Sequence, residues 1–206
     1  FDYYDALETE EDLLALFEVL NSVRDINNRP ACFTPFSLSA NIDFENIIQN
    51  NFEEYFFEDL ITTFKKLNEL NTYNLIKEGI RNKCFLPQFH GREHVNVPLF
   101  KKLLIEKNES LIFNINQSSF SKILDSNNNL LPNSIAFYEQ DLNSIEEQKN
   151  IIESGITMFE SVYGYRPTNF MPPSATIYSG LYPILFKNGI KYFDTYRFKK
   201  SNSSFF

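Results

Sequence analysis

The chain has 206 residues, of which 43% are hydrophobic and 16% are aromatic, so it is long and apolar enough to form one domain with a substantial core. A net charge of −8 and the lack of any basic run argue against a nucleic-acid partner. No apolar run reaches the ~18 residues that a membrane span needs, and no signal peptide is visible, so we expect a cytoplasmic protein.

The first part of the chain is expected to be mainly helical. Thr9-Glu-Glu-Asp12 has the form of a capping box, with Asp in place of the usual Glu or Gln, and apolar residues with helical period follow it. Residues 27–30 end that helix, and residues 31–36 are predicted to form a strand. Residues 52–57 are acidic and aromatic and favour either a strand or a loop. Further helices are predicted over residues 43–49, 60–67 and 72–81.

The rest of the chain alternates between strands and helices. Cys84–Phe89 is a short apolar run typical of a buried strand, and Asn96 has the character of an N-cap with Pro98 in the first helical turn. The polar residues 116–134 are predicted to be a surface loop, with a lid over a site as the alternative. The alternation predicts a parallel sheet or barrel covered by helices. The remaining predictions are strands at 111–115, 168–171 and 190–193, and helices at 143–163 and 182–188.

Two cysteines and one glycine carry structural expectations. Cys32 and Cys84 lie in apolar segments and are expected to be reduced core residues, although two cysteines also permit one disulfide. Gly155 lies inside the long predicted helix, where glycine costs ~1 kcal/mol relative to alanine. We therefore expect another element to pack closely against it.

Both histidines of the chain fall within His90-Gly-Arg-Glu-His94. Neutral imidazole is the commonest side-chain metal ligand, and two imidazoles at this spacing can bind one ion. His90 follows a predicted strand, and His94 lies in the loop before a predicted helix. Active sites of α/β folds are built at this position, so the pentad predicts a site for a divalent metal ion.

Three neighbours of the histidines are candidates for supporting or substrate-binding roles. Gln88 lies two residues before His90, so the alternation of a strand places it on the same face, where it could hydrogen-bond a ligand imidazole. Arg92 and Glu93 lie between the two histidines, and an ion pair is favoured over a catalytic role for them.

Several motifs together resemble a bacterial branch of the polysaccharide deacetylase superfamily. They are Phe89-His-Gly-Arg-Glu-His94, Arg29-Pro-Ala-Cys-Phe-Thr-Pro35, Gly164-Tyr-Arg-Pro-Thr-Asn-Phe-Met-Pro-Pro173 and Tyr4-Asp-Ala-Leu-Glu-Thr9. The resemblance covers nearly the whole chain and implies a distorted, incomplete (β/α) barrel over residues 1–206. It also implies a divalent metal ion, with zinc the expected one, on His90, His94 and an aspartate. The implied reaction removes N- or O-acetyl groups from an amino sugar or polysaccharide, which makes a carbohydrate the expected partner.

The sequence departs from that family at several positions. Gly91 replaces the usual Ser or Thr, Met171 replaces an arginine, and no later histidine is present to act as general acid. The family strand with two aspartates, one a ligand and one a base, is expected ahead of Phe1, and neither Asp2 nor Asp5 has a strand-like context. No catalytic residue is therefore assigned.

Two other interpretations remain open. A barrel that has lost catalysis would bind glycans or act as a scaffold. The letters His90-x-x-Glu93-His94 also fit the inverted zinc-protease motif, which requires one continuous helix over the motif. In that case Glu153 or Glu160 is a candidate for the third ligand.

Overall fold

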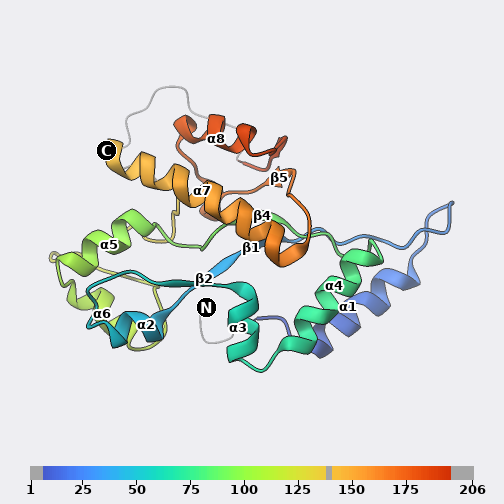
Figure 1. The fold of residues 1–206 in the computed structure, drawn as a ribbon, viewed down its shortest axis with the longest axis horizontal. Helices are drawn as coiled ribbons and strands as arrows, with labels where there is room; N and C mark the ends of the chain where they lie inside the picture. The colour runs from blue at the N-terminus through green and yellow to red at the C-terminus, as the bar shows by residue number, and fades with distance from the viewer. Residues whose placement is uncertain (1–6, 138–140, 196–206) are drawn as a thin grey trace.

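The computed structural model describes residues 7–137 and 141–195, and within them the fold is α/β (Figure 1). The main sheet has four strands, and each neighbouring pair is parallel. A second, two-stranded sheet is antiparallel. The main sheet has the order β1 (Phe36–Leu38), β4 (Gln88–Gly91), β5 (Asn169–Phe170) and β6 (Tyr192–Phe193), and the small sheet pairs β2 (Ala40–Ile42) with β3 (Phe57–Asp59). The prediction of a parallel sheet combined with helices is confirmed.

The described residues form eight α-helices, and most begin at a side-chain cap. Thr9 and Asp12 form the predicted capping box, in which each side chain accepts a hydrogen bond from the other residue's backbone. Asn96 caps the helix that contains Pro98, as expected. The helices are α1 (Glu10–Ser22), α2 (Phe44–Gln49), α3 (Leu60–Lys66), α4 (Leu70–Arg81), α5 (Val97–Ile105), α6 (Glu109–Ile115), α7 (Leu142–Tyr163) and α8 (Tyr182–Lys187).

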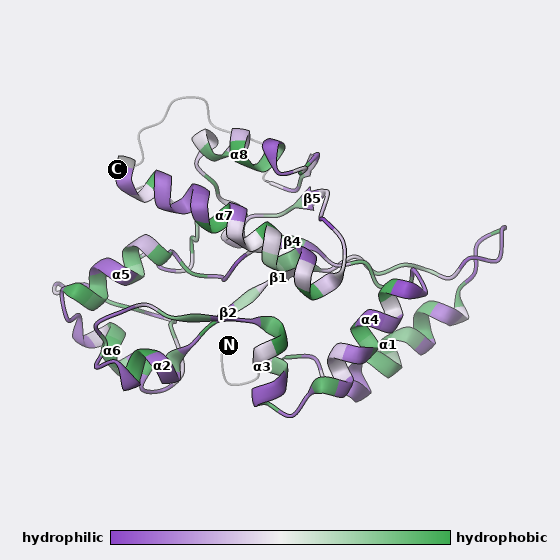
Figure 2. Cartoon of the chain, viewed as in Figure 1, coloured by the Kyte–Doolittle hydropathy of each residue, from purple (hydrophilic) through white to green (hydrophobic). Residues whose placement is uncertain are grey.

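Aromatic side chains join the main sheet to α7, which crosses over it (Figure 1). Phe89 of β4 is fully buried and makes edge contacts with Phe159 of α7 and a tilted contact with Phe170 of β5. The middle of α7 is more hydrophobic than its N-terminal end, as Figure 2 shows. These contacts fix the carboxyl ends of β4 and β5 relative to one another.

The strands of the main sheet begin later than the sequence predicted. Residues 31–35 make only a single bridge, between Phe33 and Phe85, and β1 begins at Phe36. Pro35 and Pro87 lie between this bridge and the start of the β1–β4 pairing, and proline cannot donate a hydrogen bond to a ladder. The strands predicted at 31–36 and 84–89 therefore begin only at Phe36 and Gln88.

The strand predicted at 111–115 was wrong, and the prediction for the two cysteines was wrong in part. Residues 111–115 belong to α6, because the side chain of Asn108 accepts a hydrogen bond from the Leu111 amide and starts a helix there. Cys84 is buried and free, as expected, but Cys32 is exposed and free because it precedes the regular sheet.

The segment 116–134 is irregular, as predicted, but it is anchored. Ile123 is fully buried, and an antiparallel bridge joins Leu124 to Leu130. The side chain of Asp125 closes the turn by accepting hydrogen bonds from the backbone amides of Asn127 and Asn129.

The hydropathy of the helices bears on membrane insertion. Among the helices that the structure describes, none has both the length and the apolar character needed to cross a bilayer.

Candidate metal site

His90 is the third residue of β4 and lies at the carboxyl end of that strand. Its Nδ1 lies 2.7 Å from the carbonyl oxygen of Met171, and because a carbonyl only accepts, Nδ1 carries the proton and donates. Nε2 is then unprotonated and has the lone pair that a metal ligand needs. Burial lowers the pKa of His90, which favours the neutral form of the ring.

His94 lies in the bend that connects β4 to α5, and its ring approaches that of His90. The two ring centroids are 5.3 Å apart, with an angle of 55° between the ring planes. A tetrahedral ion with nitrogen ligands at ~2.0–2.1 Å would hold two imidazole centroids about 5.2 Å apart. The separation of the two rings therefore fits shared coordination of one ion.

Gly91 begins the bend in a backbone conformation that favours glycine. Its φ is +134°, although the space around it would admit a Cβ at ordinary contact distances of 3.5 Å or more. Glycine at this position therefore has a backbone cause.

Gly91→Ser is expected to lower the free energy of unfolding by about 1–2 kcal/mol, because serine must adopt the same positive φ. Urea denaturation of the variant and the wild type measures this difference. Equal stability would mean that the bend relaxes without cost and that φ does not explain this glycine.

Arg92 and Glu93 form a buried ion pair between the two histidines. They are 7% and 3% exposed, and the Arg92 guanidinium donates to both Glu93 oxygens at 2.6 and 2.7 Å. Tyr55 donates a third hydrogen bond to Glu93, at 2.7 Å, and Arg92 also donates to Ser154 of α7 at 3.2 Å. The predicted ion pair is present, and it is buried rather than solvated.

Gly155 lies where α7 passes over the bend. A Cβ at this position would lie 2.9 Å from the Cβ of Arg92 and 3.0 Å from Cζ of Phe89. The expectation that this glycine permits close packing is confirmed.

Gln88 has a different role from the one expected. It shares the partly exposed face of β4 with His90, as the alternation predicted. Its carboxamide oxygen accepts hydrogen bonds from the amides of Thr168 and Asn169, at 3.0 and 2.9 Å. Gln88 therefore holds the start of β5 rather than orienting an imidazole, since the neighbouring strand presents two amides to it.

Among the described residues, His90 and His94 are the two candidate ligands for this site. Across residues 7–137 and 141–195, no group of three His, Cys, Asp or Glu side chains is placed to hold a metal ion. Glu153 and Glu160 pair instead with Lys187 and Arg166. Asp2 and Asp5 lie outside the described residues.

The inverted zinc-protease interpretation was wrong about the local structure. His90 lies in a strand and residues 92–95 form a bend, so the continuous helix that the motif requires is not formed.

The two histidines line different clefts. His90 lies in a cleft of about 660 Å³ that also includes β1, Glu8, Asp12 and Tyr163. His94 lies in a cleft of about 480 Å³ that is formed largely by residues 120–134. Leu38 lines both clefts. The segment predicted as a loop or lid is therefore a wall of the cleft beside His94.

Comparisons of the chain with protein-family models, with curated proteins and with solved structures found no match. The resemblance to polysaccharide deacetylases therefore depends on the sequence motifs alone.

Sequence reasoning missed two groups that support the site. Tyr55 lies 38 residues before Glu93, and only its place in an acidic, aromatic segment distinguished it. The carbonyl of Met171 belongs to the backbone, so the identity of its side chain gave no indication of its bond to His90.

Proposed function

We propose that this chain is a metal-dependent hydrolase of the polysaccharide deacetylase type, which removes N- or O-acetyl groups from an amino sugar or polysaccharide. The observation that carries the proposal is the paired geometry of His90 and His94. Their ring centroids lie at a separation suited to one ion, and the bond from His90 to Met171 leaves Nε2 available.

The proposed architecture is a distorted, incomplete (β/α) barrel, which is finer than the α/β sheet described above. β1 is an edge strand of the described sheet, and it lines the same cleft as His90. The family resemblance implies a further strand that carries two aspartates, and we place it beside β1. One aspartate would then be the third ligand, and the other would accept a proton from water.

A divalent ion in such a site, with zinc the expected one, would act as a Lewis acid and would lower the pKa of a bound water. In this arrangement His90 and His94 would hold the ion, and the clefts on either side would receive the sugar. No further histidine exists in the sequence, so the proton donor to the leaving group would be a carboxylate, a tyrosine or a second water.

Metal analysis of the full-length protein tests this proposal. We expect about one equivalent of zinc or a similar ion in the wild type, and its loss in His90→Ala and in His94→Ala, because two ligands come from these residues. Cys32→Ser is the matched control, since it removes an exposed metal-binding side chain outside the site and should leave the metal content unchanged. Acetate release from acetylated amino sugars should follow the metal content.

A binding or scaffold role without catalysis is the alternative, and the lack of a third ligand among the described residues favours it. A wild-type protein that stays free of metal after incubation with zinc would reject the hydrolase and leave this alternative. Metal retention in both histidine variants would place any ion elsewhere.

A further inference from the structure

The carboxylate of Glu93 connects His94 to a tyrosine that is distant in sequence. Glu93 precedes His94 directly, and its Oε1 accepts hydrogen bonds from Tyr55 at 2.7 Å and from Arg92 at 2.6 Å. We propose that Tyr55 is a positioning residue that acts through Glu93 to hold the His94 imidazole where it can share an ion with His90. This inference rests on the metal site proposed above.

The ends of the bend are fixed by backbone hydrogen bonds. The carbonyl of Arg92 accepts bonds from the amides of Ser39 and Ala40, at 3.2 and 2.8 Å. At the other end, the amide of Asn96 donates to the carbonyl of Asn133 at 2.7 Å. Between these points the buried carboxylate of Glu93, on the residue next to His94, is a hydrogen-bonded polar anchor of the bend.

Tyr55 is itself held rigidly against the ion pair. Its ring makes edge contact with Phe100 of α5, with a centroid distance of 5.2 Å, and stacks on Phe57 of β3 at 6.3 Å. The ring of Phe57 lies 3.8 Å from Cζ of Arg92, as a cation–π contact. Burial, together with the neighbouring Glu93 carboxylate, raises the pKa of Tyr55 well above its usual value, so the hydroxyl remains a donor.

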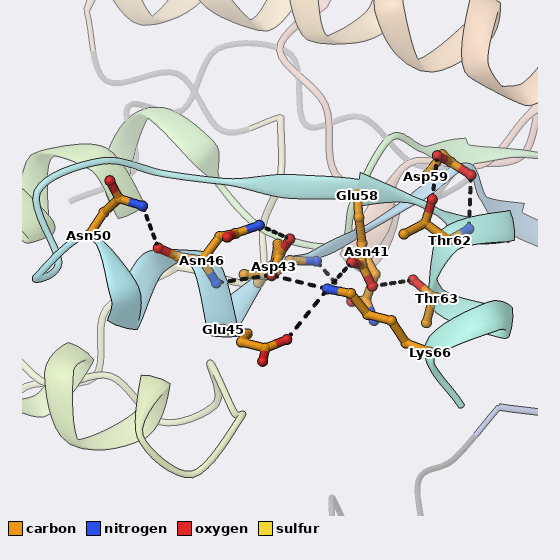
Figure 3. A network of polar contacts seen from close by, with 11 residues as sticks. Asn41, Asp43, Glu45, Asn46, Asn50, Glu58, Asp59, Thr62, Thr63 and Lys66 are labelled. Atoms are coloured by element: carbon orange, nitrogen blue, oxygen red, sulfur yellow. Dashed lines mark hydrogen bonds and ion pairs between the residues drawn. The ribbon is translucent and has the colours of Figure 1, made fainter. Parts of the chain in front are cut away.

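A polar network fixes the β2–β3 ribbon, which contains Phe57 and begins its second strand two residues after Tyr55 (Figure 3). Lys66 of α3 pairs with Glu58 of β3 at 2.5 Å and with Asp43, the cap of α2, at 3.4 Å. The amide of Asp43 also donates to the carbonyl of Phe56 at 3.0 Å. The ribbon is therefore held by the contacts of Lys66 and Asp43 as well as by the hydrogen bond from Ala40 to the bend.

Zinc titration of Tyr55→Phe tests the inference. The variant loses one hydroxyl and keeps the ring. We expect its metal affinity to fall about 10- to 100-fold, as is typical when a residue that supports the metal ligands is mutated. Tyr73→Phe is the matched control, because the Tyr73 hydroxyl donates to the carbonyl of Val162 at 2.8 Å, away from the bend. Both variants should lose similar thermal stability, and only Tyr55→Phe should lose affinity.

The imidazole NMR spectrum gives a second readout that needs no metal. The chain has only two histidines, so the metal-free protein gives one set of ring signals for each. We expect Tyr55→Phe to shift or broaden the His94 signals, and Tyr73→Phe to leave them unchanged. Unchanged His94 signals together with wild-type affinity in Tyr55→Phe would overturn the inference. Failure of the wild type to bind zinc would overturn the proposed function, and the His94 signals would still decide the role of Tyr55.

Discussion

Glu93→Leu is expected to lower the free energy of unfolding by about 3–5 kcal/mol, because it leaves the buried guanidinium of Arg92 without its counter-charge. Tyr55 also loses its acceptor in this variant. Guanidinium chloride denaturation, followed by circular dichroism, measures the change.

Two further variants separate the loss of charge pairing from other causes. Glu146→Leu removes an exposed carboxylate that pairs with Lys149 on α7, and its effect should stay within about 0.5 kcal/mol. The double variant Arg92→Met/Glu93→Leu should recover much of the lost stability, because no unpaired charge remains. A double variant as unstable as Glu93→Leu would mean that shape, and not charge, makes the pair necessary.

Gly155→Val is expected to lower the free energy of unfolding by about 3 kcal/mol through overpacking. The added carbons meet the Cβ of Arg92 and the ring of Phe89, both of which are held by buried neighbours. Thermal unfolding measures the loss, and Asn150→Ala on the exposed face of the same helix should instead raise stability slightly. A stable Gly155→Val protein would show that α7 moves away from the bend at little cost.

The parts of the fold that the sequence predicted correctly are those with local causes. The capping box at Thr9, the helical period of α7 and the strand–loop placement of the two histidines all depend on neighbours within a few residues. The packing role of Gly155 was also predicted, because a glycine inside a helix needs a compensating reason.

The errors arose where pairing partners are distant in sequence. The starts of β1 and β4 depend on the prolines that precede both strands, and apolar character alone could not place them. A strand was predicted at 111–115 because these residues are apolar, but the N-cap at Asn108 starts a helix there. The metal ion, its third ligand and the sugar remain predictions.

The hydrogen bond between His90 and Met171 spans 81 residues, which has a consequence for the order of folding. During synthesis both histidines leave the ribosome well before the carbonyl that sets the tautomer of His90. The pairing of β4 with β5 must form first, and such non-local parallel pairing is slow. In the proposed site, competence to bind a metal ion should therefore develop late, and a nascent chain would carry both imidazoles without their final geometry.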